Sequence, residues 1–415
     1  MQKTKTLCRL LLFFIMICLL SGCWDREELE DKAYVIGLGL DRSNDKDKIK
    51  ITMLLANPEV GSLQGGGGST EKPREIITFD ANDFIAAKAT ANSIISRNIS
   101  YELLRIFVVS EEFARDSSFA TTFTDVLKDK EIRLNSYIAV SKEKASQYFV
   151  NNKPRMETRP HKYFQFMVSH GIENGLIPDS NLFRYFQTAE RGSDLFLAMY
   201  TTAKRQKDPK LKREDEYTAG ELNATGELDE TQFIGSAVFK SGVMFATLTG
   251  QETRTVNILD DTTDIKDILI NIPDPFSDNK KQFAARIMKT ENNKIKMNLK
   301  GITPKIFITI PLQIEIMSNP SMVNFAKEKN QQIIKKHIAN HIEKANIELL
   351  KKTQTKLKGI PYPLPVYSKK YFATIQEFKK FNWVKAYPRA EIDVKVDIII
   401  VDYGNRTRNA KRLGE

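Results

Sequence analysis

Two of the four histidines, His337 and His341, are four residues apart, which is the spacing of two metal ligands on one face of a helix. A zinc-protease helix carries glutamate directly after its first histidine, but here Ile338 follows. The other two, His161 and His170, flank an aromatic run with no cysteine or carboxylate between them. The pattern favours histidines beside packed surfaces, and we expect no metal site and no cofactor.

Four acidic residues also lie close together in the chain: Asp260, Asp261, Asp264 and Asp267. Such carboxylates suit general acid–base chemistry, but we expect them to solvate and cap a short helix over residues 265–270. There is no Gly-x-Ser-x-Gly elbow and no Walker loop. Gly37 and Gly39 fail the dinucleotide-binding pattern, because Arg42 replaces its third glycine and a strand follows. The residues indicate no catalytic site, although a hidden Ser-His-Asp triad stays open.

Cys23 has chemistry of another kind, because it ends a stretch built like a secretory leader. Three basic residues in the first nine positions precede an apolar run over 10–20, and Ser21 and Gly22 come directly before the cysteine. The ending Leu-Ser-Gly-Cys resembles the lipobox of bacterial lipoproteins, which implies a signal peptide over 1–22 and a diacylglyceryl group on the Cys23 thiol. An uncleaved anchor is one alternative, but the run is about half of the ~20 residues that cross a bilayer. An ordinary leader cut elsewhere is the other.

The remaining cysteines, Cys8 and Cys18, lie inside the leader. The mature chain would therefore hold no disulfide and no free thiol, which suits an extracytoplasmic protein that its core alone stabilises. Each CH₂ of a buried acyl chain contributes about 0.8 kcal/mol, so a doubly acylated Cys23 should stay on the membrane.

Size and charge narrow the class of protein further. The chain has 415 residues, 41% of them hydrophobic and 28% charged, which predicts a folded protein of two or three domains. Its formal net charge of +11 would attract it to anionic lipid headgroups, although a solvated basic surface has the same composition. The leader sends the chain out of the cytoplasm, so nucleic acid is not an expected partner.

The first half alternates between strand and helix patterns. Strands are expected over 33–40, 49–55, 75–79, 103–109 and 133–140. A helix capped by Asp80 should bury Phe84, Ala87, Ala91, Ile94 and Ile95, and a second over 119–129 should bury Leu127. Another helix begins near Lys142. The Gly-rich segment 61–70 reads as a surface loop, and this half predicts a mixed sheet covered by helices.

The second half opens with a polar linker over 201–231 and a hairpin over 233–248. Strands are expected over 294–299 and 305–317, with Pro311 at an edge or bulge. A helix from Pro320 to about Lys356 should bury Ile334, Ile338, His341, Ala345 and Leu349 and expose most of its lysines. A final strand covers 390–403.

These patterns predict an α+β fold, an elongated multi-domain protein of mixed sheets with packed helices. The expected parts are the signal peptide over 1–22, an N-terminal α+β domain over 23–195, a middle region with linker and hairpin over 196–280, a C-terminal α+β domain with a long helix over 281–404, and a basic tail over 405–415.

Several segments resemble one family, the C-subunit lipoproteins of bacterial spore germinant receptors (Ger(x)C family). The match starts at Cys23-Trp24-Asp25-Arg26-Glu27-Glu28-Leu29-Glu30 and runs through residues 35–41, 104–114, 130–135 and 235–240 to Trp383 and Tyr387-Pro388. It spans nearly the whole mature chain. The Gly65–Gly68 tract and the loop over 362–368 depart from the family pattern.

The resemblance implies a non-enzymatic subunit on the outer face of the spore inner membrane, held by lipid on Cys23, with two integral membrane receptor subunits as partners. It also implies three α+β domains in an elongated arrangement and no catalytic residues. Which nutrient triggers the receptor, and whether this subunit contacts it, cannot be read from the residues. Two other classes stay open: an extracytoplasmic solute-binding lipoprotein of a transporter, with two similar lobes about a cleft, and a lipid-tethered hydrolase.

Overall fold

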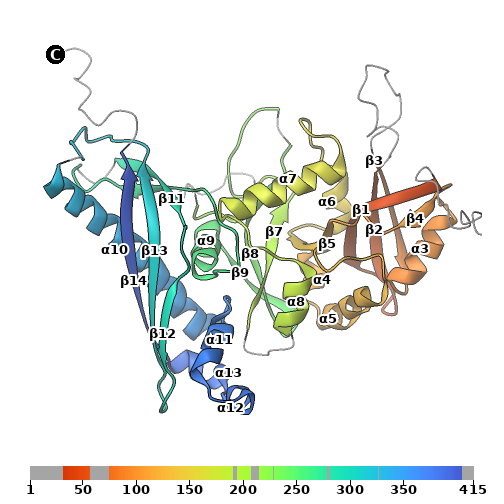
Figure 1. The fold of residues 1–415 in the computed structure, drawn as a ribbon. Coiled ribbons are helices and arrows are strands. Elements are labelled where there is room, and N and C mark those ends of the chain that lie inside the picture. The colour runs from red at the N-terminus through yellow and green to blue at the C-terminus, as the bar shows by residue number, and fades with distance from the viewer. Residues whose placement is uncertain are drawn as a thin grey trace, which may run out of the picture.

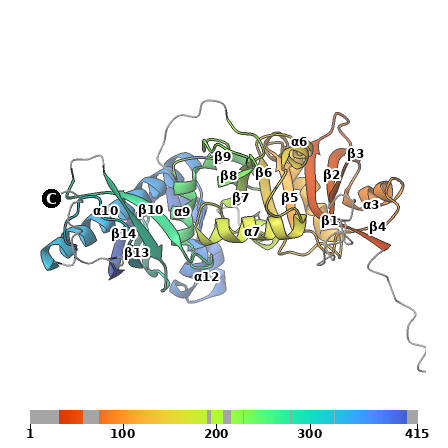
Figure 2. The ribbon, with the colours of Figure 1, turned by 90° about the horizontal axis from the view of Figure 1, so that it is seen from above.

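A computed structural model describes residues 31–56, 74–189, 194–206, 215–227, 229–277, 281–325 and 327–403. Cys23, the Gly-rich segment 61–70 and the basic tail 405–415 lie outside the described residues. The molecule is elongated, with one large sheet at each end and a helix between them (Figures 1 and 2). The α+β fold with mixed sheets and packed helices is confirmed.

The first sheet has nine strands in the order β3-β2-β1-β5-β6-β7-β8-β9, and the short β4 pairs with the start of β1. Its centre is parallel from β1 through β5 and β6 to β7, and both flanks are antiparallel. The strands are β1 Lys32–Arg42, β2 Ile49–Ala56, β3 Arg74–Ala81, β4 Asn98–Ser100, β5 Ile106–Ser110, β6 Tyr137–Ser141, β7 Phe196–Thr202, β8 Gln232–Lys240 and β9 Val243–Leu248.

Helices cover both faces of this sheet. One apolar core lies under α3, α4, α5 and α8, and another lies under α6 and α7. Because both faces are covered, the central strand β5 is buried at every position, which explains its uninterrupted apolar run. The helices are α3 Phe84–Asn92, α4 Glu111–Ala114, α5 Ser117–Thr124, α6 Ala145–Asn151, α7 Pro160–Glu173 and α8 Leu182–Ala189.

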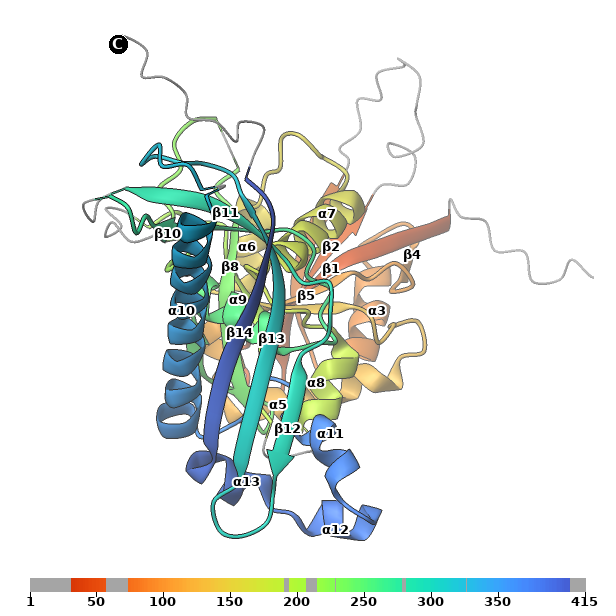
Figure 3. The same ribbon diagram turned by 60° about the vertical axis from the view of Figure 1, so that its left-hand side comes forward.

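The second sheet has five strands, in which β10, β11, β13 and β12 follow one another and β14 pairs with β13. Helix α10 connects β13 to the parallel strand β14 and packs on one face of the sheet (Figure 3). Its elements are β10 Ile268–Pro273, β11 Gln282–Met288, β12 Lys294–Asn298, β13 Lys305–Ile316, α10 Glu328–Lys352, α11 Leu364–Tyr367, α12 Ile375–Lys380, α13 Trp383–Ala386 and β14 Glu391–Asp402.

Pro311 lies inside β13 and does not end it. On one side of β13, β12 pairs only as far as Thr309 and β11 begins at Gln313, while β14 pairs along the whole other side. Proline has no backbone N–H to donate, and here that position faces a gap between two neighbouring strands. Pro311 therefore lies at a local edge of the sheet, inside a strand that continues past it.

Several expected helix details in the first half are wrong. Asp83, and not Asp80, caps α3, because its side chain accepts hydrogen bonds from the backbone N–H groups of Ile85 and Ala86. The helix ends at Asn92, so Ile94 is 59% exposed. The second helix changes to a 3-10 turn at Asp125, which turns Leu127 outward to 50% exposure.

The second half also differs from expectation. The apolar residues from Ile268 onward form strand β10, where a helix was expected over 265–270. Helix α10 starts at Glu328, eight residues after Pro320, and buries Ile342 and Asn346 where His341 and Ala345 were expected. Strands β7, β8 and β9 extend the first sheet, and the expected domain limits stay predictions. None of the helices in the described residues is long and apolar enough to cross a membrane.

The hairpin predicted over 233–248 is confirmed, and its geometry depends on residues with positive φ. Ser241 and Gly242 connect β8 to β9 with φ of 51° and 80°, as in a type I′ turn. Gly235, within β8, has φ of 87°, and a Cβ atom there would lie 2.3 Å from the carbonyl oxygen of Leu248. Only glycine fits this position.

We predict that Gly235→Ala destabilises the protein by more than about 3 kcal/mol, because it adds a backbone clash to an unfavourable φ. Gly301→Ala is the matched control: its φ is 90° but nothing lies within 4 Å of its added Cβ. The control should cost only about 1 kcal/mol. Urea unfolding followed by circular dichroism measures both, and equal losses would contradict the clash.

Candidate functional site

The histidines do not form a site. The Nε2 atom of His337 lies 2.8 Å from the carbonyl oxygen of Pro273, and the ring of His170 stacks on Phe166. Burial, together with the nearby Arg159 and Lys162, lowers the pKa of His161. In the described part of the chain, no group of three or more His, Cys, Asp or Glu side chains is placed to hold a metal ion.

The four clustered aspartates do not cap a helix of their own; each pairs with a basic residue. Asp260 pairs with Arg184 and Asp261 with Lys289, both at 2.8 Å. Asp264 pairs with Lys266 and Asp267 with Arg286, also at 2.8 Å. Since three of the four partners come from other elements, the aspartates connect parts of the molecule. The expected short helix is wrong, and Asp260 and Asp261 are buried in ion pairs, whereas Asp264 and Asp267 are exposed to solvent as expected.

The Asp260 and Asp261 pairs lie at the C-terminal end of helix α9 (Gly250–Leu259), which lies between the two sheets (Figure 1). Its N-terminus carries a capping box, in which Thr249 and Glu252 each accept the other's backbone N–H. Every residue from Thr253 to Leu259 is buried. A helix that is buried all round belongs to the interior of the protein, so α9 is part of the core that joins the two halves.

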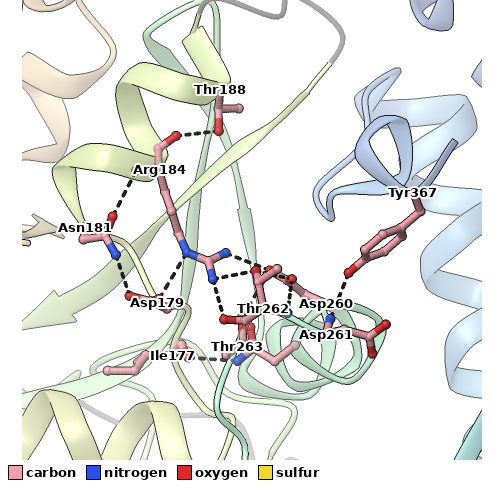
Figure 4. Close-up of polar contacts among 11 residues, drawn as sticks. Ile177, Asp179, Asn181, Arg184, Thr188, Asp260, Asp261, Thr262, Thr263 and Tyr367 are labelled. Carbon is pink, nitrogen blue, oxygen red and sulfur yellow. Dashed lines mark hydrogen bonds and ion pairs between the residues drawn. The ribbon is translucent and has the colours of Figure 1, made fainter. Parts of the chain in front are cut away.

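On the first-sheet side, Arg184 of α8 reaches the end of α9 (Figure 4). Its Nε donates to Asp179 at 3.1 Å and its Nη1 to Asp260 at 2.8 Å. Its Nη2 donates to the carbonyl and the hydroxyl oxygens of Thr262, at 2.9 and 2.8 Å. The planar guanidinium thus holds three residues in a fixed arrangement.

The second sheet is attached to the same helix end. Lys289 Nζ donates to the carbonyl oxygen of Ile258 at 2.7 Å while it pairs with Asp261, and both side chains are at most 10% exposed. Asn293 donates to the same carbonyl at 3.0 Å, and Tyr367 of α11 accepts the backbone N–H of Asp261 at 3.0 Å. A cation at a helix C-terminus is favoured by the helix dipole.

Burial changes the proton affinities here. For Arg184, burial opposes the charge, but the carboxylates of Asp260 and Asp179 outweigh it and raise the pKa of the guanidinium. Burial raises the pKa of Asp179, and the nearby Arg184 only partly offsets this. Burial also raises the pKa of Tyr367, which stays protonated at neutral pH.

A cavity of about 500 Å³ opens beside this cluster, between the two halves. Much of its wall is apolar, with Phe183, Phe196, Val256, Pro363 and Val366. Its Arg184 and Asp260 side chains already bond each other and their neighbours, so they are not free to orient a ligand. The arrangement joins two halves; it does not present a nucleophile beside a base.

The sequence reasoning named the aspartates but missed Arg184, Lys289 and Tyr367, which lie far from them in the chain and belong to no motif. One signal was available: Thr249-Gly250-Gln251-Glu252 is the capping-box pattern and marks the start of α9. Cys23, the one predicted site residue, lies outside the described residues.

We call the contacts of Arg184, Asp260, Lys289 and Asp261 the junction cluster. We predict that Arg184→Met lowers the free energy of unfolding by about 2–4 kcal/mol, because it leaves Asp260 buried without its cation. Arg155→Met is the matched control, since Arg155 pairs with Glu227 at 3.0 Å and both side chains are more than half exposed. It should cost less than about 0.5 kcal/mol. Urea unfolding measures both, and similar small losses would show that the cluster does not hold the halves together.

The comparisons with known proteins agree with this fold. The family model "Spore germination protein N-terminal domain" matches residues 25–202, and "Spore germination B3/ GerAC like, C-terminal" matches residues 234–404. The putative spore germination protein YfkR of Bacillus subtilis (strain 168) is 22% identical over 405 residues, 96% of this chain and 97% of the relative.

Two further similarities concern spore germination protein KC and the GerBC protein. The first, from the same organism, is 28% identical over 137 residues, 32% of this chain and 33% of its own length. The crystal structure of the second matches with a TM-score of 0.51 and 15% identity, over 90% of this chain and 100% of that chain. At this identity the likeness shows the fold alone.

Proposed function

The chain belongs to the Ger(x)C family of spore germination proteins, and from this membership we propose that it is the lipid-anchored C subunit of a nutrient germinant receptor that triggers spore germination. The observation that carries the proposal is the pair of family matches over residues 25–202 and 234–404. A relative named as a putative spore germination protein matches over nearly the whole of both chains.

The proposed role is non-enzymatic, and the subunit acts through its interfaces. In the described residues the acidic cluster is neutralised by basic partners, and the histidines contact packed groups. The apolar core runs without a break from Leu197 on β7 through α9 to the second sheet. A body joined in this way transmits a displacement at one end to the other, which suits a subunit that supports assembly or relays a signal.

The proposed position is the outer face of the spore inner membrane. Cys23 would carry the diacylglyceryl group and thus be the lipid attachment site, directly after the signal peptide. The described chain begins eight residues later, at Asp31, and β1 follows at Lys32. The folded body would then lie close to the lipid surface.

The proposed partners are two integral membrane receptor subunits. Lys335, Lys336, Lys344 and Lys351 are exposed on α10 and offer one contact surface. Lys352 does not belong to it, because its Nζ pairs with Glu252 of α9 at 2.6 Å. The basic residues over 406–412 are a second candidate contact, outside the described residues.

A solute-binding lipoprotein of a transporter has less support. Such proteins close two similar lobes about a ligand cleft. Here the sheets differ in strand number and order, and a continuous core joins them.

We predict that tagged protein from detergent-solubilised spore inner membranes co-purifies two integral membrane partners, and that Cys23→Ala weakens their recovery. The physical reason is that loss of both acyl chains removes the protein from the membrane. Mass spectrometry of the purified fraction identifies the partners. Recovery of the wild type alone, or with an ABC-type permease, would overturn the proposal and favour the solute-binding class.

We also predict that replacing the four exposed α10 lysines by glutamine, or in a second variant the four basic residues over 406–412, weakens partner recovery in the same assay, with Cys23 intact. The matched control replaces Lys46, Lys130, Lys144 and Lys153, which are exposed on the first-sheet half. We call these four the control lysines. Unchanged partner recovery after replacement of the α10 lysines and of the basic residues over 406–412 would show that neither surface contacts the partners.

A further inference from the structure

One end of the second-sheet half is built from two separate segments. The loop over residues 299–304 connects β12 to β13, and α12 and α13 lie at the same end (Figures 1 and 3). The hydroxyl of Tyr371, just before α12, donates to the carbonyl oxygen of Ile295 in β12 at 2.9 Å. We call the surface formed by residues 299–304 and 369–389 the tip.

The tip exposes isolated aliphatic side chains. Ile302 is 81% exposed, Ile375 is 72% exposed and Val384 is 48% exposed. Beneath the exposed side chains, the ring of Phe381 contacts those of Phe372 and Trp383. Trp383 is only 5% exposed. The segment is therefore a folded element that presents its aliphatic residues outward.

The tip is also strongly basic. Residues 368–389 hold six Lys or Arg residues against the single acid Glu377, and the hairpin over 294–305 holds four lysines and no acid. Within the ranges that the structure describes, the exposed Lys300, Lys379, Lys380 and Lys385 form no ion pair with a carboxylate. Lys289, by contrast, pairs with Asp261 in the junction cluster. The tip therefore carries four exposed lysines whose charge no carboxylate of the described residues neutralises.

We propose that the tip docks on a bilayer that contains anionic lipids, with its lysines at the headgroups and Ile302 and Ile375 inserted at the boundary with the acyl chains. Lysines attract an anionic leaflet, and their long stems allow the ammonium groups to stay at the headgroups while apolar neighbours are buried. A protein partner fits less well, because the centres of protein interfaces are depleted in lysine, and here lysines lie among the exposed aliphatic residues.

This contact would be separate from the lipid on Cys23. A tether at one residue leaves the body free to rotate, whereas a second contact at the tip fixes which face meets the membrane. The proposal does not require the lipid anchor or the receptor partners, so it can be tested without either of them.

The experiment uses the mature chain, residues 23–415, with Cys23→Ser, which cannot be acylated. Sedimentation with large vesicles of phosphatidylcholine and 30 mol% phosphatidylglycerol is compared with sedimentation on pure phosphatidylcholine. We expect binding to the anionic vesicles, little binding to the neutral ones, and loss of binding as salt rises from 0.05 to 0.5 M.

Three sets of variants locate the contact. Glutamine at Lys300, Lys379, Lys380 and Lys385 should lower the partition coefficient by roughly 600-fold, since each lysine near the surface contributes roughly fivefold. Glutamine at the four control lysines removes the same charge and should lower it much less. Ile302→Ser with Ile375→Ser should lower it about tenfold without changing its salt dependence.

Circular dichroism establishes that each variant is folded. Failure of the Cys23→Ser chain to bind anionic vesicles would overturn the proposal. An equal loss of binding with the tip set and the control set would also overturn the proposal. Binding would then depend on the net charge of the protein and not on the tip. Both results would leave the receptor assignment intact, since partner recovery tests that separately.

Discussion

The relative position of the two sheets depends on the buried end of helix α9. Arg184 reaches it from the first sheet's helices, Lys289 from the second sheet, and Tyr367 from the chain that returns to β14. Taking charges out of water is costly, and only good geometry and further hydrogen bonds compensate for it. Asp260 has both, because it accepts from Thr262 and Thr263 as well as from Arg184. A displacement of either sheet would break several of these bonds together, so the cluster defines one arrangement of the halves.

Apolar packing also joins the two sheets, and it involves more residues than the polar contacts do. One buried core contains Leu195, Leu197 of β7, Val256 of α9 and Ile338 of α10. The backbone adds to it, because Leu195 donates its N–H to the carbonyl oxygen of Ile360 at 2.8 Å. The cavity beside the junction is thus a gap in a joined body and not a cleft between hinged lobes. Such a body is suited to transmitting a contact at one end to the other.

The sequence predicted correctly those elements whose pattern of apolar and polar residues agrees with their burial in the fold. Strands β1 and β2 are apolar runs bounded by a polar turn, the β8–β9 hairpin has a clear turn signal, and most of α10 has an apolar stripe opposite charged residues. Helix α9 was missed because it is buried all round and so shows no apolar stripe. Strand β10 was read as a helix because its aspartate-rich approach looks like a cap, although Ile268, Ile270 and Ile272 alternate as a strand does.

The site was harder to predict than the elements, for a physical reason. Asp260 and Arg184 are 76 residues apart, and Asp261 and Lys289 belong to different elements, so no local spacing relates them. Without the fold, a run of aspartates reads as solvated surface. The fold pairs Asp260 and Asp261 with basic residues at the junction, while Lys300, Lys379, Lys380 and Lys385 of the tip form no ion pair within the described residues. The charges that join the two halves are therefore neutralised inside the protein, and the lysines of the tip remain available for an external partner.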